Sequence, residues 1–477
     1  MLVEIGAQQM PINRNIIPRF SDARRLALFF AVLVAVATIA HGARAQGLPL
    51  IRDAEIEALL QDYSKPIFQA AGFGGGRVTV RIINNDAFNA FVLDGANVFV
   101  NTGTLMQAET PNEVIGVIAH ESGHIAGGHM AALRARIAKD QTRALLTQVL
   151  GIGAMVAGGV TGGDSGRDTM QGGQALLQGG SSVIMKGLLA ERRSQESAAD
   201  QAGIKYLTAT KQSGKGMLDT FERFKEQEYL TDQFQDPFIR SHPLSADRLA
   251  RLDQLATTSP YFNQKDPPSL QLRHDLMRAK LSGYLESPAT VFNRYPDSNK
   301  TLPARYARAI AKFFRGGPGA LEGAVQDTDA IIRENPSYPY FHELKADFLM
   351  RSGKLAAAVP SLRQALKLAP NSPLIRVELA TSVQAVETAD AQNEATELLR
   401  KSLVEDPENG HAYRLLANIY YKQGRGPEAD AMTAQAYFYE GSIAQAQIFA
   451  KRAQLKLRSG SPEWLKNDDI INYKPQT

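Results

Sequence analysis

From about residue 78 the chain has short runs of apolar residues separated by polar ones. Residues 78–83 and 97–101 are rich in valine, isoleucine and phenylalanine, which predicts two short strands. Residues 89–95 between them predict a further strand that ends in a turn at Gly95. The pattern therefore indicates a small sheet.

A long apolar helix is expected after the sheet. Thr110-Pro111-Asn112-Glu113 combines a capping box with proline at the first helical position. The residues that follow are apolar on nearly every side until Gly127-Gly128 stops the pattern. We therefore expect a buried helix that ends near Gly127, and a second long helix from about Ser182 to Thr208.

A glycine-rich stretch separates these two helices, with eleven glycines in residues 151–180. Glycine at this density lowers the stability of regular elements, because it loses the most conformational freedom on folding. Two interpretations are open, a mobile flap beside a functional site and a disordered surface insertion.

The chain is helical from about residue 300, and it repeats. Asn335-Pro336 and Ala369-Pro370 stand 34 residues apart, and Asp406-Pro407 follows 37 residues later, with the three extra residues assigned to 384–393. Glycine recurs at the expected inter-helix turn, at Gly317, Gly353 and Gly424. A helix-turn-helix period of 34 is typical of tetratricopeptide repeats, which stack into a solenoid with a concave binding face. The alternative is a helical bundle without repeats.

The N-terminus carries a separate apolar run. Arg24 and Arg25 precede the apolar residues 26–40, and Ala43-Arg44-Ala45 follows. A positive segment, a run shorter than the roughly 20 residues that span a bilayer and an A-x-A site predict a signal peptide cleaved after Ala45. An uncleaved anchor is the alternative. No later segment reaches spanning length, so we expect the mature protein to be soluble or peripheral to a membrane.

Composition narrows the function classes. The chain has 477 residues, of which 44% are hydrophobic and 21% charged, a balance typical of globular proteins. The formal net charge of +4 comes mostly from the first 45 residues, so the nearly neutral body gives no case for nucleic-acid binding. The absence of cysteine excludes disulfides and thiolate ligands, so any metal must be held by histidine and carboxylates.

The motif His120-Glu121-Ser122-Gly123-His124 lies on the predicted buried helix. His120 and His124 are one turn apart and project from one face, where two imidazoles can bind one zinc ion. Glu121 is expected beside the open coordination position, where it can take a proton from water. Burying three ionisable side chains in an apolar helix is costly unless they are paired or bind a metal. The alternative is a histidine pair satisfied by its neighbours.

A catalytic zinc ion needs a third protein ligand. The helix around residues 188–200 offers Glu196 and Asp200 on one face. Glu196 can reach the metal, while Asp200 accepts the N–H of a ligating histidine. Glu191 is the alternative ligand, and a surface helix with ordinary charges is the other interpretation.

His-Glu-x-x-His followed by Glu-x-x-Ala-Asp, with Asn89-Ala-Phe upstream, resembles the zinc peptidases of the HtpX and CAAX-prenyl-protease type. The signal peptide, the lack of membrane spans and the repeats match their periplasmic, BepA-like subgroup from Gram-negative bacteria. The resemblance implies outer-membrane protein quality control as the biological setting. It also implies one zinc ion per chain, Glu121 as the base, Asp200 as the partner of a ligand, and three ligands, His120, His124 and Glu196.

Three more residues have open roles. His129, five residues past His124, is expected to turn away from the histidine pair and to be structural. His242 precedes Pro243 on a turn and is a candidate fourth ligand that gates the site, a transition-state stabiliser or a plain turn residue. Arg248 is a candidate oxyanion stabiliser, although a surface salt bridge is the favoured interpretation.

The sequence thus predicts an α+β zincin-like metallopeptidase domain, mostly helical with a small sheet, followed by an all-α tetratricopeptide-repeat solenoid. The expected segments are a signal peptide over 1–45, the peptidase over 46–265 with the glycine-rich insertion at 151–180, a helical linker over 266–300, the repeats over 301–460 and a tail over 461–477.

The predicted function is a periplasmic zinc-dependent endopeptidase that degrades misfolded or stalled envelope and outer-membrane proteins. The expected partners are protein substrates and, through the repeats, the outer-membrane protein assembly machinery, with peripheral contact with the outer membrane and no nucleic acid. The alternative is a chaperone or assembly factor whose zinc site is structural or normally shut. The repeats favour this alternative, and the intact Glu121 opposes it.

Overall fold

The computed structural model describes residues 49–76, 78–93, 96–142, 187–225, 237–386 and 388–474. These residues belong to one compact unit that begins at Pro49. The predicted signal peptide (1–45) and glycine-rich insertion (151–180) lie outside the described residues. Where the structure is described, no helix combines the length and the apolar character that crossing a membrane requires.

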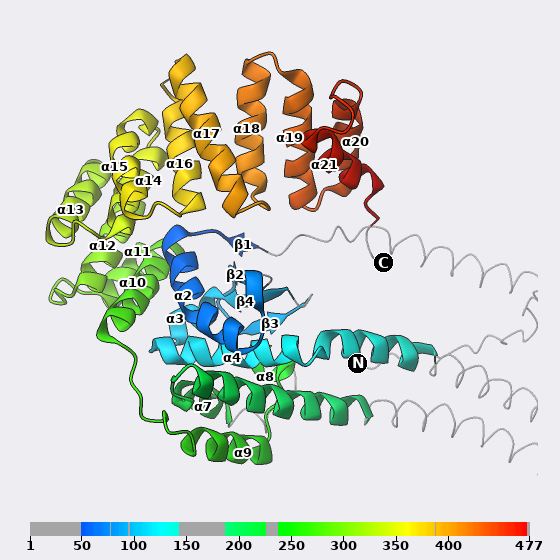
Figure 1. Cartoon of the computed structure of the whole chain (residues 1–477). Coiled ribbons are helices and arrows are strands. Elements are labelled where there is room, and N and C mark those ends of the chain that lie inside the picture. The colour runs from blue at the N-terminus through cyan, green and yellow to red at the C-terminus, as the bar shows by residue number, and fades with distance from the viewer. Residues whose placement is uncertain are drawn as a thin grey trace, which may run out of the picture. The chain divides into compact units, whose positions relative to one another are not determined.

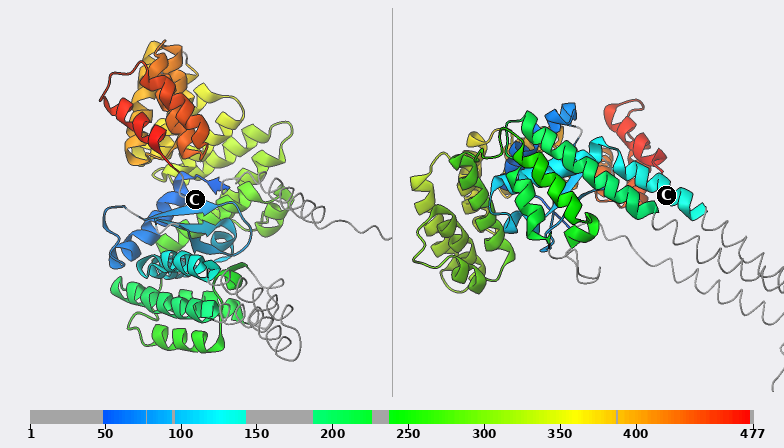
Figure 2. Two further views of the ribbon diagram at one scale, coloured as in Figure 1. Left: turned by 90° about the vertical axis from the view of Figure 1, so that its right-hand side faces the viewer. Right: turned by 90° about the horizontal axis from the view of Figure 1, so that it is seen from below.

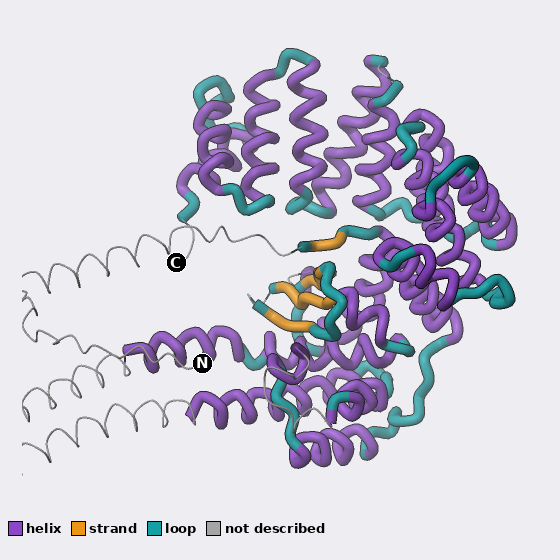
Figure 3. The backbone as a smooth tube through the Cα atoms, turned by 180° about the vertical axis from the view of Figure 1, so that it is seen from behind, coloured by secondary structure: helices purple, strands orange, loops and turns teal. Residues whose placement is uncertain are grey.

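The predicted small sheet is present, with a further strand, β1, that was not predicted, and it is small beside the helices around it (Figure 3). The order of its strands is β1-β2-β4-β3. The central strands β2 and β4 are parallel, with Val80 opposite Val98, and the outer strands pair antiparallel to them. The strand β3 is therefore a sheet edge. The bounds are β1 Leu50–Ile51, β2 Thr79–Ile83, β3 Ala90–Val92 and β4 Asn97–Asn101.

The predicted buried helix is α4, Pro111–Ala126. The side chain of Thr110 and that of Glu113 form the predicted capping box, and Gly127 is the C-terminal cap. The helix packs against α2 and α7, and Val114 and Ile118 on it are fully buried. Both ends and the burial of this helix are therefore confirmed.

The other helices of this part surround α4 and the sheet. Helical residues 187–209 run alongside α4, as the front view and the view from below both show (Figures 1 and 2). Residues 129–142 are also helical. The remaining bounds are α2 Ala54–Ala70, the 3-10 turn η2 Gly74–Gly76, α3 Thr102–Gln107, α7 Lys215–Arg223, α8 Pro237–Ser241 and α9 Ala246–Thr257.

The rest of the described chain is helical, and antiparallel helices follow one another in a row (Figure 1). Gly353 and Gly424 have φ of 74° and 72° at the turns between paired helices, a left-handed conformation that favours glycine. The predicted repeat turns are therefore confirmed. The bounds are α10 Pro268–Leu285, α11 Pro288–Arg294, α12 Leu302–Arg315, α13 Ala320–Glu334, α14 Pro339–Arg351, α15 Leu355–Leu368, α16 Pro373–Gln384, α17 Ala389–Glu405, α18 Gly410–Lys422, α19 Gly426–Tyr439, α20 Ile443–Gln454 and α21 Pro462–Asn472.

A buried ionic cluster joins the start of α2 to α10 and α14. The ammonium group of Lys280 lies 2.8 Å from Asp53, 3.3 Å from Glu55 and 3.4 Å from Glu343. The hydroxyl groups of Tyr306 and Tyr338 donate hydrogen bonds to the carboxylate of Glu55, at 2.8 and 2.7 Å. The N-terminal end of α2 is therefore fixed to the first repeat helices by side chains far apart in the sequence.

Candidate metal centre

Four buried side chains from three segments meet in one cluster. His120 and His124 project from α4, Glu196 comes from helical residues 187–209, and His242 follows α8. One donor atom from each lies within 4.8 Å of the others. The two histidines of the motif, the predicted third ligand and the candidate fourth ligand are thus brought together.

The separations between these donor atoms match those of a tetrahedral zinc site, in which bonds of about 2.1 Å place neighbouring ligand atoms about 3.4 Å apart. Nε2 of His120 lies 3.1 Å from Nε2 of His124 and 3.3 Å from Oε2 of Glu196. Nδ1 of His242 lies 3.2 Å from each of Nε2 of His120 and Oε2 of Glu196. The donor set therefore fits a metal ion with four protein ligands.

Two imidazoles of the cluster also have an acceptor on their outer side. Nδ1 of His120 lies 2.9 Å from Oδ1 of Asp200. Nε2 of His242 lies 3.1 Å from the carbonyl oxygen of Ala90 on β3. Such outer acceptors hold the ring N–H away from the metal and so leave the inner nitrogen with its lone pair free for coordination.

Close backbone packing brings together the two helices that carry His120, His124 and Glu196. A Cβ atom built on Gly123 would lie 2.7 Å from the carbonyl oxygen of Ala199. Glycine within the histidine motif therefore lets α4 approach helical residues 187–209 closely. This approach brings Glu196 within 3.5 Å of His124.

Glu121 lies beside the four donors but is not one of them. Its Oε1 lies 3.3 Å from Nε2 of His242, and no aligned hydrogen bond to it is present among the described residues. Burial raises the pKa of Glu121, and electrostatic interactions with His242 and His120 oppose that rise. A carboxylate with a raised pKa is suited to general-base catalysis.

The second carboxylate has the opposite electrostatic environment. Although burial acts to raise the pKa of Glu196, contacts with His242, His120 and His124 hold it well below its usual value. Burial lowers the pKa of His124 to about 4 despite its contact with Glu196. Glu196 is therefore an anion and His124 neutral near pH 7, as metal ligands must be.

Arg248 is buried, so the expectation of a surface salt bridge is wrong. Its guanidinium donates to both carboxylate oxygens of Asp200, at 2.6 and 2.9 Å, and lies 3.1 Å from Glu196. It also donates to the carbonyl oxygen of Pro243 at 3.0 Å. In this arrangement Arg248 holds Asp200 and the segment after His242 in place.

Two further expectations about this region are wrong. Glu191 pairs with Arg136 at 3.0 Å and is not among the four donors, so it is not the alternative ligand in this arrangement. His129 does not turn away from the motif, because its Nδ1 lies 2.9 Å from Nδ1 of His124. Helical spacing fails at His129 because a turn at residues 127–128 separates it from α4. The alternative of ordinary surface charges is excluded for Glu196 and Asp200, each only 3% exposed.

Comparison with known proteins agrees with this geometry. The profile of Peptidase family M48 matches residues 50–256, which contain all four donors and Glu121. A profile of the tetratricopeptide repeat matches residues 306–373 and 383–437. The chain carries a peptidase domain of family M48 followed by tetratricopeptide repeats. The predicted combination of a peptidase domain and tetratricopeptide repeats is therefore confirmed.

The chain is similar to curated proteins over different shares of its length. It is 23% identical over 405 residues to the beta-barrel assembly-enhancing protease of Escherichia coli (strain K12), covering 83% of this chain and 78% of that one. It is 24% identical to the protein of the same name from Yersinia pestis, covering 82% and 77%. Metalloprotease LoiP of Escherichia coli is 28% identical over 192 residues, covering 39% of this chain and 68% of that one.

Sequence reasoning missed the groups that hold His242 in place. The side chain of Arg192 donates to the carbonyl oxygen of Ser241 at 2.8 Å, and the hydroxyl of Ser241 donates to Asn89 at 3.0 Å. Asn89 stood in the upstream motif, which was a usable signal. The sequence gives no signal for the carbonyl group of Ala90, because every residue has the same backbone acceptor.

Proposed function

We propose that this protein is a zinc-dependent endopeptidase of the periplasm that degrades misfolded or stalled outer-membrane proteins. The observation that carries the proposal is the cluster of four buried donors, His120, His124, Glu196 and His242, with the carboxylate of Glu121, whose Oε1 accepts no aligned hydrogen bond, beside it. A purely structural site has no need of such a carboxylate. The M48 domain supports peptide-bond hydrolysis as the reaction.

His120, His124 and Glu196 would hold the zinc ion, with Asp200 orienting His120. When bound, the ion acts as a Lewis acid and lowers the pKa of water to about 7. Glu121 takes the proton of the attacking water and passes it to the amine that leaves. Its raised pKa supports both transfers, because a group that must accept and then donate a proton works best near the operating pH.

His242 gates this site in our proposal. Catalytic zinc sites keep one coordination position open, whereas four protein ligands close it. With Nδ1 of His242 near both His120 and Glu196, the site has its full set of protein ligands and is shut. Opening requires His242 to leave, which breaks its contact with Ala90 and the hydrogen bond from Arg248 to Pro243. Arg248 keeps both hydrogen bonds to Asp200, and its Nη1 group, which loses Pro243, is the predicted oxyanion stabiliser in this proposal.

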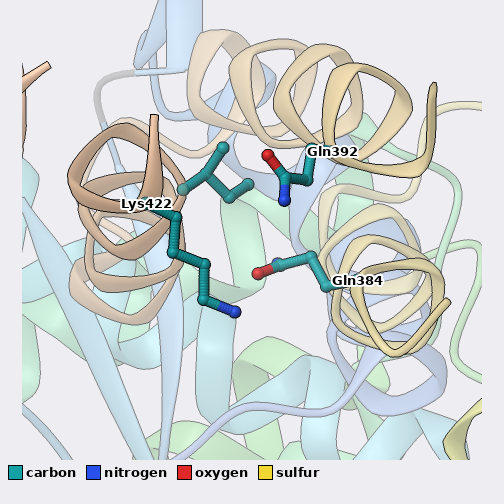
Figure 4. A pocket seen from close by; sticks show the side chains of 4 residues that line it. Gln384, Gln392 and Lys422 are labelled. Atoms are coloured by element: carbon teal, nitrogen blue, oxygen red, sulfur yellow. The ribbon is translucent and has the colours of Figure 1, made fainter. Parts of the chain in front are cut away.

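The repeats bind the protein substrates or partners in this proposal. They contain a hollow of about 270 Å³ lined by Gln384, Gln392, Ile419 and Lys422, and Figure 4 shows the polar ends of three of these side chains facing one space. Amide and ammonium donors at one point suit a peptide with backbone carbonyls or carboxylates to bind. The names of the relatives point to the assembly of β-barrel proteins as the setting. Peripheral contact with the outer membrane belongs to the same proposal.

A turnover assay with the purified mature chain tests the function. We expect the zinc-loaded chain to cleave an unfolded protein substrate, and a chelator to stop the cleavage until zinc is returned. The absence of cleavage by a zinc-loaded chain, both in wild type and in a variant without His242, would remove the endopeptidase proposal.

The second candidate function is a chaperone or assembly factor. The convergence of four protein donors is the observation that favours it, because a metal ion held by all four would have no open position and would not cleave. The two functions separate in an aggregation assay. A chaperone role predicts that wild type and Glu121→Gln suppress aggregation of an unfolded outer-membrane protein equally, with no fragments formed by either.

A further inference from the structure

One histidine of the region has no part in the mechanism above. His129 is the first residue of helical segment 129–142, and its Nδ1 lies 2.9 Å from Nδ1 of His124. The two rings meet edge to face, with centroids 4.9 Å apart and planes at 81°. The short distance between the two Nδ1 atoms allows the N–H of one ring to donate to the nitrogen of the other.

The contacts of His124 determine which of its nitrogens carries the proton, and so which ring donates the hydrogen bond. Nε2 of His124 faces the cluster, 3.1 Å from Nε2 of His120 and 3.5 Å from Glu196. A neutral imidazole that presents a lone pair at Nε2 must carry its proton at Nδ1. That proton therefore points at Nδ1 of His129, which accepts it in the tautomer protonated at Nε2. On the corresponding outer side of the ring, His120 has the carboxylate of Asp200 and His242 has the carbonyl oxygen of Ala90.

The chain makes room for the ring of His129 at Gly127. A Cβ atom on Gly127 would lie 2.3 Å from Nε2 of His129, and the next nearest atoms to it also belong to that ring. Gly127 has φ of −75°, which any residue can adopt, so its backbone conformation does not require glycine. A side chain at this position is disfavoured because it would collide with the ring of His129. The next residue, Gly128, has φ of 63° and turns the chain back so that His129 reaches His124.

We propose that His129 is a positioning residue for the metal centre, which accepts the Nδ1–H of His124 and thereby fixes the ring and tautomer in which His124 binds zinc. The inference rests on the proposed zinc site. Outer-shell acceptors of this kind change metal affinity by about 10- to 100-fold when removed. His129 touches neither water nor substrate in this role, and it acts only through His124.

Zinc affinity of the full chain, measured by competition with a chromophoric chelator, tests the proposal. We expect His129→Ala to raise the zinc dissociation constant by about 10- to 100-fold. His129→Asn should bind zinc within a few-fold of wild type, because its Oδ1 takes roughly the place of the imidazole Nδ1. His411→Ala, which removes an exposed histidine of α18, is the matched control and should leave the constant unchanged.

A double-mutant cycle tests whether Gly127 and His129 affect zinc binding through the same contact with His124. Gly127→Ala should displace the ring and weaken zinc binding as much as His129→Ala, and the two changes together should cost no more than either alone. Equal affinities for His129→Ala and wild type would overturn the proposal, as would His129→Asn binding as weakly as His129→Ala. A wild-type chain that binds no zinc would overturn the proposed function and this inference with it.

Discussion

Nε2 of His242 lies 3.3 Å from Oε1 of Glu121, so the proposed gate and the proposed base touch each other. Both side chains are buried, with 4% of His242 and 1% of Glu121 exposed. A water molecule activated by Glu121 needs the space beside that oxygen. The movement that opens a coordination position therefore also exposes the base, and the first two predictions follow from this coupling.

Glu121→Gln should remove proteolysis while zinc content and fold stay unchanged. Glutamine keeps the shape of the side chain but cannot accept the proton, and general-base catalysis contributes about 10²- to 10⁴-fold to a rate. Turnover of an unfolded substrate, beside zinc content by metal analysis, checks both halves. His124→Ala is the contrasting variant and should lose the metal, because two protein ligands bind zinc poorly. Turnover by Glu121→Gln within a few-fold of wild type would refute the role as base.

His242→Ala should raise basal proteolysis and leave zinc stoichiometry unchanged, because three ligands remain and the fourth position opens to water. The measurement is the initial rate of substrate cleavage beside zinc content. Lower activity with zinc retained would instead make His242 a stabiliser of the transition state. Unchanged activity and affinity would leave it a turn residue.

Acid should destabilise the chain through His274 on α10. Burial lowers its pKa to about 4, and its Nε2 faces the carbonyl oxygen of Ala108 at 3.0 Å. The unfolded chain binds the proton more readily, so the free energy of unfolding falls as pH drops from about 6.5 toward 4, by about 3 kcal/mol.

The variant His274→Gln isolates this effect. Glutamine cannot take up the proton, so chemical unfolding at pH 7 and at pH 4.5 should show a smaller fall than in wild type. His342→Gln, on α14, is the matched control. An unchanged pH dependence in His274→Gln would contradict the assignment.

Replacement of Lys280 by methionine should cost about 3 to 5 kcal/mol of unfolding free energy, because it leaves buried carboxylates without their cation. Chemical unfolding at pH 7 measures the loss. Lys345→Met is the matched control, since Lys345 pairs with Asp329 at 2.7 Å in a more exposed position. Surface pairs of that kind contribute about 0 to 1 kcal/mol. Equal effects of the two substitutions would show that the buried cluster contributes no more than a surface pair.

The repeats should bind proteins without the peptidase part. The sequence boundary at 301 would uncover α12, which packs along α10, so the fragment should begin at Pro268. We expect immobilised residues 268–474 to retain an unfolded outer-membrane protein, and Lys422→Glu in the lined hollow to reduce the retention. A folded fragment that retains nothing would contradict the prediction.

The sequence was most informative where one local signal decided the structure. The capping box at Thr110 placed α4, and the spacing of His120 and His124 placed two donors on one face. Contacts between distant segments could not be predicted in this way. Lys280 and Glu55 are separated by more than 200 positions, and no periodicity in either segment points to the other. His129 was misread because helical spacing was extended across Gly127-Gly128, where the helix ends.

The contact between Gly123 and Ala199 also has a consequence for how fast the centre exchanges its ion. In the proposed site, His120, His124 and Glu196 are anchored on two helices whose backbones touch, so movement of His242 alone leaves three ligands in place. Release requires α4 and helical residues 187–209 to separate, and such local opening is far slower than rotamer motion. Exchange of one divalent ion for another should therefore follow the opening rate of this helix pair and be independent of the concentration of the incoming ion.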